Sequence, residues 1–171
     1  MKKILFVCLG NICRSPMAEF IFKDLVKKQG LEKKYTASSA GTSNEEVGND
    51  MHYGAKDKLD EKGVLYSKHK ARQLRREDYN KYDYIIGMES YNIRNILRIV
   101  GEDKENKVHR LLDFTNNPRD IADPWYTGNF EATYNDIVEG CKEFLEYLSE
   151  GKNKYRKKIG IKFNTAAYIL I

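Results

Sequence analysis

The chain has 171 residues, of which 41% are hydrophobic and 12% are aromatic. This length predicts one domain that buries roughly 70% of the surface of its unfolded chain. Only 3 prolines and 12 glycines are present, which excludes a collagenous or low-complexity chain. The 3 cysteines, an odd number, exclude a disulfide framework and indicate a reducing compartment, so we expect a cytoplasmic protein.

The net charge of +5 belongs to the end of the chain. Six of the 30 basic residues lie between Lys152 and Lys162, after the last acidic residue, Glu150. The rest of the chain has 24 basic and 25 acidic residues, so its net charge is close to zero. A nucleic-acid-binding protein needs a basic face on its folded part, so this distribution argues against nucleic acid as a partner. No stretch approaches the ~20 apolar residues of a membrane span, and the apolar run Ile4–Leu9 is shorter than that of a signal peptide.

The first predicted element is a strand over Ile4–Cys8, whose continuous apolar run is typical of a parallel strand covered on both faces. Ser15 and Pro16 then predict the N-cap and the first turn of a helix that continues to Gly30. Strand, short loop and helix therefore form the opening unit of the fold.

The rest of the predicted domain continues this alternation. Strands are predicted over 35–39, 82–88 and 108–112, and helices over 50–62, 90–100 and 130–148. The segment 113–129 holds two of the three prolines and is predicted to be a long loop, which in a compact domain is usually functional. Strands that alternate with helices predict an open, mostly parallel α/β sheet.

Residues 150–171 depart from this pattern, because a basic run precedes an apolar end over 165–171. This composition favours a disordered extension or an artefact over a strand that docks on the sheet or a contact with a membrane surface. We therefore expect one domain over 1–149 and a separate extension over 150–171.

The loop between the first strand and the first helix, Cys8–Pro16, carries the residues that are suited to chemistry. Open α/β sheets bind ligands at the carboxyl ends of their strands, where a helix N-terminus offers unpaired N–H groups and a positive dipole end. Gly10 lets the loop curl so that backbone N–H groups point inward, and Arg14 can bind two oxygens of a phosphate. We therefore expect an anion site with Cys8 beneath it.

The same surroundings favour the thiolate form of Cys8, because nearby positive charge stabilises it. The Ser15 hydroxyl could donate a further hydrogen bond to the sulfur. A cysteine in a strand is more often a core residue, and five residues between Cys8 and Arg14 are by themselves a weak signal. Together with the preceding strand, Gly10 and the helix start, however, they favour a nucleophilic phosphate loop.

The segment 7–16, VCLGNICRSP, closely resembles the signature loop of the low-molecular-weight protein tyrosine phosphatases. The resemblance continues through 39–43 (SAGTS), 69–73 (HKARQ), 83–88 (DYIIGM) and 123–126 (DPWY), and it covers residues 1–149. It implies a flavodoxin-like four-stranded parallel sheet with helices on both faces. It also implies hydrolysis of phosphotyrosine in proteins and of small aryl phosphates, with no cofactor and no metal.

The resemblance assigns roles to the loop. Cys8 would form a thiophosphate intermediate, and Arg14 would bind the transferring phosphoryl group. The other phosphate-binding residues would be Leu9, Gly10, Asn11, Ile12, Cys13 and Ser15.

A proton donor for the leaving phenoxide is expected in the long loop. Asp113, Asp120 and Asp123 are all candidates there, and the pattern of residues alone ranks none of them above the others. The resemblance selects Asp123 as the general acid and base.

Trp125 and Tyr126 match an aromatic wall that grips a phenyl ring. The family more often has Tyr at position 125, and the opposite wall commonly carries an aromatic residue near Glu45. We expect these two departures to change substrate preference and not the chemistry.

Further residues match supporting roles. Asn11, Ser39 and His69 match a hydrogen-bond network that holds the loop, whereas His52 and His109 match nothing. Cys13 lies in the same loop as Cys8, and the resemblance favours a reversible disulfide between them that protects the nucleophile. Two further residues have structural roles: Arg72 is expected to pair with an acidic neighbour, and Cys141 is expected in the core.

Three other functions fit the sequence less well. Arsenate reductases of this fold need further cysteines, and only Cys141 remains, on a predicted buried face. A phosphate-binding regulator would not need Cys8, Arg14 and Asp123. Arginine-phosphate phosphatases typically have threonine where this chain has Ile12. We therefore expect tyrosine-phosphorylated proteins as partners, and a monomer or weak dimer.

Overall fold

A four-stranded parallel sheet lies at the centre of the structure, as predicted, and its strand order is β2–β1–β3–β4. The computed structural model describes residues 1–151; residues 152–171, and with them nearly all of the predicted extension, lie outside the described residues. In chain order the elements are β1 (Lys2–Cys8), α1 (Arg14–Lys28), β2 (Tyr35–Gly41), α2 (Tyr53–Glu61), α3 (Asp78–Lys81), β3 (Tyr84–Gly87), α4 (Ser90–Val100), β4 (Val108–Arg110), the 3₁₀ helix η1 (Leu111–Phe114), α5 (Pro124–Thr127) and α6 (Phe130–Glu150).

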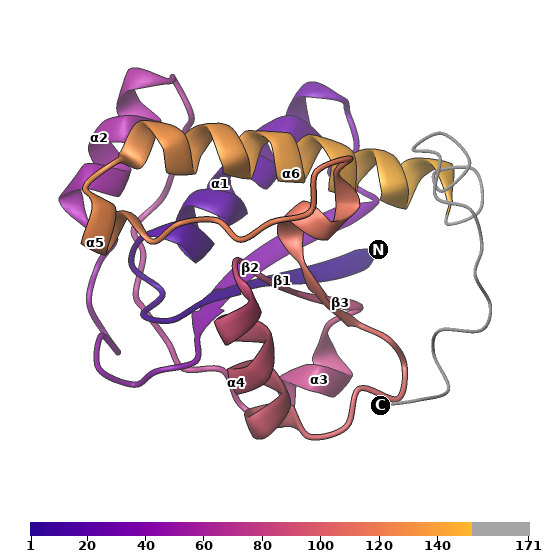
Figure 1. Cartoon of the computed structure of the whole chain (residues 1–171). Helices are drawn as coiled ribbons and strands as arrows, with labels where there is room; N and C mark the ends of the chain where they lie inside the picture. The colour runs from indigo at the N-terminus through magenta and orange to yellow at the C-terminus, as the bar shows by residue number, and fades with distance from the viewer. Residues whose placement is uncertain (152–171) are drawn as a thin grey trace.

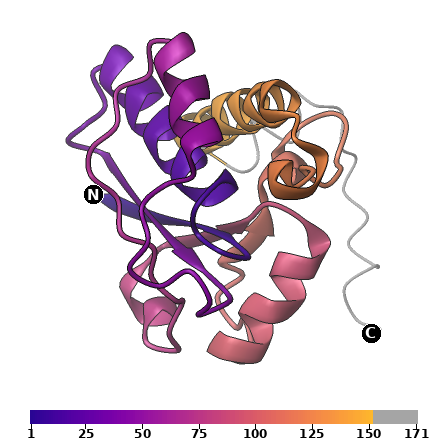
Figure 2. The same cartoon turned by 90° about the vertical axis from the view of Figure 1, so that its left-hand side faces the viewer.

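Helices cover both faces of this sheet: α1, α2 and α6 lie on one side, and α3 and α4 on the other (Figures 1 and 2). Side chains of a strand point alternately to its two faces, and β1 therefore contributes to two separate cores. Ile4, Phe6 and Cys8 pack with α1 and α6, whereas Leu5 and Val7 pack with α4. The continuous apolar run of β1 is explained by this burial on both faces.

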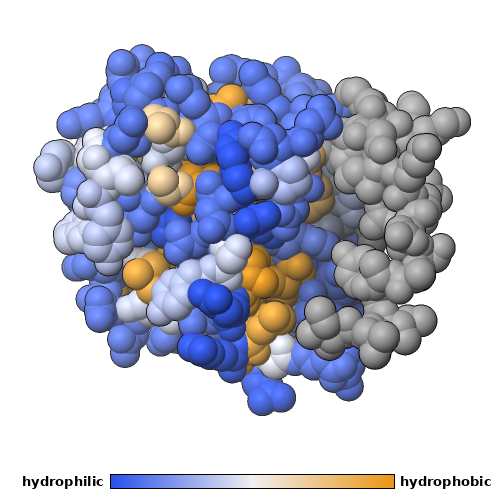
Figure 3. All heavy atoms as spheres, viewed as in Figure 1, coloured by the Kyte–Doolittle hydropathy of each residue, from blue (hydrophilic) through white to orange (hydrophobic). Residues whose placement is uncertain are grey.

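The outer surface is mostly hydrophilic on the face shown in Figure 3, where apolar residues form small, separate patches. Helix α6 illustrates how apolar side chains are kept from this surface. It buries one apolar stripe that includes Ile137, Cys141 and Phe144. Gly140 lies on the same stripe, where a Cβ atom would come within 2.5 Å of Leu111 Cγ. Glycine at this position lets η1 pack directly against α6.

The start of α1 differs from the prediction. Cys13, and not Ser15, occupies the N-cap position, and no side chain forms a capping hydrogen bond there. Ser15 lies inside the first turn and is fully buried, with its hydroxyl turned back toward Cys8. The predicted N-cap was wrong because this serine bonds within the site.

The segment predicted as a long loop, 113–129, contains the end of η1 and the whole of the short helix α5. Helix α5 begins at Pro124 with Asp123 as its N-cap and ends before Gly128, which has a φ of 67°. The capping residue Asp123 and the terminating Gly128 can both be read from the sequence. A helix of four residues, however, is too short to show a periodic pattern of apolar side chains. Helix α3 is of the same length and was missed for the same reason.

The register of the strands brings three chain segments to one edge of the sheet. Cys8 is paired with Gly41 at the end of β2, and the neighbouring Val7 is paired with Gly87 at the end of β3. The segments that follow these strands therefore meet at the carboxyl edge, where open α/β sheets form their sites.

Arg72 pairs with an acidic neighbour, as predicted. Its guanidinium donates to both oxygens of Asp78 at 2.9 and 3.3 Å, and the Asp78 side chain is only 4% exposed. The carbonyl of Arg72 also accepts from Gly41 N (2.8 Å) at the edge where the strands end. This pair therefore anchors a segment that lies beside the site.

We expect the substitution Arg72→Met to lower the free energy of unfolding by about 2 kcal/mol. Removal of one partner of a buried ion pair costs roughly 3–5 kcal/mol, and partial exposure of Arg72 reduces this effect. Arg75→Met is the matched control, because the Arg75 side chain is exposed and forms no ion pair with any described residue. Urea denaturation followed by circular dichroism measures both; equal losses would contradict a stabilising role of the pair.

Candidate active site

The segment from Cys8 to Ser15, here called the Cys8 loop, curls between β1 and α1 and is held from outside by backbone hydrogen bonds. The carbonyls of Cys8, Leu9 and Ile12 accept from the N–H groups of Thr42, Ser43 and His52 at 2.8–2.9 Å. A Cβ atom on Gly41 would lie 2.7 Å from Leu9 O, so the end of β2 and the loop are in close backbone contact. Two segments distant in sequence thus fix the shape of the loop.

Asn11 is the most constrained residue of the loop. It is fully buried and has a φ of 59°, a left-handed conformation that asparagine tolerates better than most residues. Its side chain donates to Ser15 Oγ (2.8 Å) and accepts from Arg72 N (3.0 Å), and its carbonyl lies 2.7 Å from His69 Nε2. These contacts offset the cost of the unusual backbone angle.

The sulfur of Cys8 lies inside this curl. Asn11 N donates to Cys8 Sγ at 3.3 Å, and Ser15 Oγ lies 3.0 Å from the same sulfur. The Ser15 oxygen already accepts a hydrogen bond from Asn11, so its proton is directed to Cys8 Sγ or to Ala40 O, which is 3.3 Å away. With the N-terminus of α1 beside it, the sulfur occupies a position that stabilises negative charge.

Arg14 is the cation of the site and is 1% exposed. Its Nη1 donates to Glu89 Oε2 (2.7 Å) and to Ile121 O (2.8 Å), and its Nη2 donates to Asp123 Oδ2 (3.1 Å). Burial alone would lower the pKa of Arg14, but the charges of Cys8, Asp123 and Glu89 raise it above its ordinary value. The guanidinium therefore remains positively charged at the base of the site.

Cys13 is a second buried thiol that lines the same space. Burial, followed by the charges of Cys8 and Asp123, raises the pKa of Cys13 to about 12. It is therefore a neutral thiol near pH 7.

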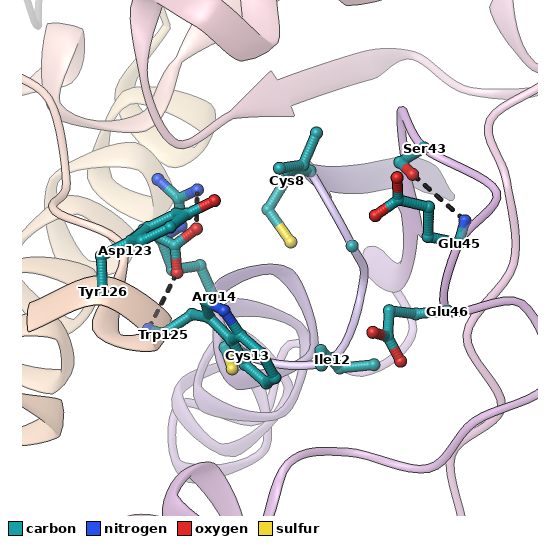
Figure 4. Close-up of a pocket in the computed structure, with 12 residues that line it drawn as sticks. Cys8, Ile12, Cys13, Arg14, Ser43, Glu45, Glu46, Asp123, Trp125 and Tyr126 are labelled. Atoms are coloured by element: carbon teal, nitrogen blue, oxygen red, sulfur yellow. Dashed lines mark hydrogen bonds and ion pairs between the residues drawn. The ribbon is translucent and has the colours of Figure 1, made fainter. Parts of the chain in front are cut away.

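These residues line a pocket that encloses about 610 Å³, its open mouth included. Figure 4 shows Asp123, Trp125 and Tyr126 on one side and Glu45 and Glu46 on the other. The pocket therefore has a base of loop residues, one wall with two aromatic rings and one wall with two carboxylates.

Of the carboxylates in the segment 113–129, which was predicted to be a long loop, only that of Asp123 lines the pocket. Its Oδ1 accepts from Trp125 N (3.1 Å) as the N-cap of α5, and its Oδ2 contacts Arg14. Asp113 and Asp120 instead form ion pairs with Arg110 at 2.7 and 2.8 Å. The structure thus distinguishes three candidates that the pattern of residues could not rank.

The remaining residues expected at the site differ in their positions. Trp125 and Tyr126 line the mouth and are 58% and 77% exposed. His69 contacts the Cys8 loop through Asn11. The Ser39 hydroxyl was expected to help hold this loop, but it donates to Glu19 of α1 (2.7 Å). Leu9, Gly10 and Ile12 complete the lining of the pocket.

Cys141 lies in the core, as predicted, and is fully buried. Burial raises its pKa far above the ordinary value of a thiol, so it remains protonated.

Sequence reasoning missed Ser43 and Glu46, which line the pocket, and two residues that contact its lining, Glu89 and His52. Glu89, which follows the end of β3, forms the ion pair with Arg14 at 2.7 Å, and its position after a parallel strand is a signal that could have found it. His52 donates its backbone N–H to Ile12 O, stacks its ring on Phe130 (centroids 5.4 Å apart) and contacts Trp125 edge-on at 5.6 Å. It therefore connects the Cys8 loop with the aromatic wall.

Within residues 1–151, no group of three or more histidine, cysteine, aspartate or glutamate side chains is placed to hold a metal ion. No helix in this part of the chain is long and apolar enough to cross a membrane.

Comparisons with known proteins agree with this geometry. The family described as low molecular weight phosphotyrosine protein phosphatase matches residues 3–154. The chain is 42% identical over 154 residues to the low molecular weight protein-tyrosine-phosphatase YfkJ of Bacillus subtilis, with 89% of this chain and 99% of the relative covered. It is 39% identical over 150 residues to the Homo sapiens low molecular weight phosphotyrosine protein phosphatase, with 85% and 94% covered.

Solved structures show the same likeness. The crystal structure of YfkJ superposes with a TM-score of 0.86 over 90% of this chain and 98% of that one. A Drosophila arginine phosphatase, DARP, superposes with a TM-score of 0.79 at 30% identity, over 90% of this chain and 100% of that one. By its sequence and by its fold, the chain belongs to the low molecular weight phosphotyrosine protein phosphatase family.

Proposed function

We propose that this protein hydrolyses phosphotyrosine in proteins through a covalent intermediate on Cys8. The observation that carries the proposal is the sulfur of Cys8 at the base of the pocket, 3.0 Å from Ser15 Oγ and 3.3 Å from Asn11 N, with Asp123 on the wall beside it. The sulfur attacks phosphorus, an S–P bond forms, and the bond from phosphorus to the tyrosine oxygen breaks.

The Cys8 loop and Arg14 stabilise the charge on the transferring phosphoryl group. Backbone N–H groups of residues 9–13 and the N-terminus of α1 supply donors for its oxygens. Arg14 adds a cation whose position is fixed, because its Nη1 is held by Glu89 and the Ile121 carbonyl. Because these donors are positioned before substrate binds, little reorganisation is needed during the reaction.

Asp123 supports both proton transfers. In the first step its protonated carboxyl group donates to the departing phenoxide, whose parent phenol has a pKa of ~10. In the second step the carboxylate removes a proton from water, which attacks phosphorus and releases inorganic phosphate and the Cys8 thiolate. Its place on the pocket wall, as the N-cap of α5, supports this role.

The depth and the wall of the pocket favour an aromatic substrate. The exposed rings of Trp125 and Tyr126 can pack against the phenyl ring of phosphotyrosine, whereas phosphoserine has no ring to make this contact. Phosphoarginine is the second candidate, because the arginine phosphatase DARP shares the fold. Ile12, which lines the pocket here, favours tyrosine by the resemblance described above.

We also propose a cytoplasmic location. All three cysteines, Cys8, Cys13 and Cys141, are free thiols, which agrees with a reducing compartment. We expect the protein to act on its phosphorylated partners as a monomer or weak dimer.

Cys8→Ser should abolish turnover and preserve the anion site. We expect kcat for an aryl phosphate to fall by about 10⁴-fold or more, since serine is a far weaker nucleophile here. Phosphate binding, followed by the fluorescence of Trp125, the single tryptophan of the chain, should change little. Turnover that persists in the variant would exclude Cys8 as the nucleophile, and lost phosphate binding would indicate a misfolded loop.

Asp123→Asn should slow the release of poor leaving groups only. Asparagine keeps an oxygen that can accept from Trp125 N, so α5 keeps its N-cap, whereas the acidic proton and the ion pair with Arg14 are removed. In single-turnover experiments we expect phosphotyrosine to lose about 10²–10³-fold in rate, and an aryl phosphate with an acidic phenol to lose less than about 10-fold. Equal losses on the two substrates would contradict the acid role.

Cys13 should protect the nucleophile from irreversible oxidation. We propose that peroxide converts Cys8 to a sulfenic acid, that the Cys13 sulfur then forms a disulfide with it, and that the thiol proton leaves with the hydroxyl as water. After peroxide treatment, a dithiol should restore most activity of the native enzyme and little of Cys13→Ser. Cys141→Ala, which removes a thiol outside the pocket, should recover as the native enzyme does; equal recovery of all three would exclude the role of Cys13.

A further inference from the structure

Two carboxylates lie at the mouth of the pocket on the side opposite the aromatic wall (Figure 4). Glu45 is exposed, and its backbone N–H donates to Ser43 Oγ (3.1 Å) in the turn that follows β2. Glu46 is partly exposed, and a Cβ atom on Gly10 would lie 3.4 Å from its Cγ, so its side chain runs along the Cys8 loop. We call Glu45 and Glu46 the acidic rim.

Neither member of the acidic rim forms an ion pair with any residue that the structure describes. The partner of Glu46 is neutral: its Oε2 accepts from Asn49 Nδ2 at 2.7 Å. Nearby Asp50, by contrast, pairs with Lys56, and Asp123 pairs with Arg14. The rim therefore presents negative charge that no side chain within residues 1–151 neutralises.

The charges of the pocket are separated along its depth. Arg14 is the one cation among the described lining residues and is buried at the base, so a phosphate dianion is attracted there. Glu45, Glu46 and Asp123 are the charged residues above it. A substrate with an anionic tip and a cation near its point of attachment fits this arrangement of charge.

We propose that the acidic rim selects phosphotyrosine sites with an arginine or lysine next to the phosphotyrosine; this inference rests on the function proposed above. With the phosphate at the base and the ring against Trp125 and Tyr126, the substrate backbone lies at the mouth. A flanking basic side chain then reaches the carboxylates of Glu45 and Glu46. Arginine is preferred, because its planar group can bind two carboxylate oxygens at once.

The expected preference is moderate. An exposed ion pair contributes about 1.5- to 5-fold to binding at low ionic strength, so two carboxylates should give about a 3- to 10-fold higher kcat/KM for a basic peptide. The contact is equal in the bound substrate and in the transition state, so KM should change and kcat should not. Because the rim is open to solvent, salt should weaken the preference.

The test uses three phosphotyrosine peptides that differ only in having arginine, alanine or glutamate beside the phosphotyrosine. For the native chain we expect the order arginine, alanine, glutamate in kcat/KM at low salt, and a smaller spread at about 0.3 M salt. In the double variant Glu45→Gln, Glu46→Gln, the ratio of the arginine to the alanine peptide should fall close to 1. Glu32→Gln is the matched control, because it removes one negative charge near the far end of α1, and it should keep the native ratio.

Equal kcat/KM for the arginine and alanine peptides with the native chain would overturn the proposed selection. An arginine preference that persists in the double variant would also overturn it, by assigning the preference to other residues. If the native chain hydrolyses the alanine peptide in either case, the phosphatase function stands and only the role of the rim fails. Hydrolysis of none of the peptides would overturn both proposals.

Discussion

The sulfur of Cys8 lies where a buried strand ends and a helix begins, and the stabilisation of negative charge at this point governs the rest of the site. Donors from Asn11 N and Ser15 Oγ reach the sulfur only because the intervening loop is tightly curled. That curl requires a left-handed backbone at Asn11, which is unfavourable in isolation. The contacts of Asn11 with Ser15, Arg72 and His69 hold the strained conformation in place.

A second charged centre organises the opposite side of the pocket. The guanidinium of Arg14 contacts Glu89 after β3, and it contacts the Ile121 carbonyl and Asp123 before α5, so one buried side chain joins the start of α1 to two distant segments. This arrangement links the loop that receives the phosphate to the residue proposed to transfer the proton. In the proposed mechanism, Arg14 and Asp123 are thereby held near the reacting atoms before substrate arrives, which is the condition for efficient electrostatic catalysis.

The walls of the pocket combine features that act on different parts of a substrate. In the proposed function, the base of the site recognises a phosphate, and the rings of Trp125 and Tyr126 recognise a flat side chain. In the proposed selection, the carboxylates of Glu45 and Glu46 recognise charge outside that side chain, at the level of the neighbouring residues. Chemistry is thus concentrated at the base, and selection among phosphorylated proteins is left to the residues at the mouth, which can vary at little cost to the fold.

The sequence by itself determined the parallel sheet and most of the helices, because apolar runs such as Ile4–Cys8 and the stripe of α6 report burial directly. The loop motif around Cys8, with its resemblance, also predicted the family. Local pattern could not tell Asp123 from Asp113 and Asp120, and it gave no sign of His52. It did suggest the Ser15 bond to Cys8, but it wrongly placed the N-cap of α1 at Ser15. Those distinctions depend on which distant segments meet at the sheet edge, and only the packed chain decides that.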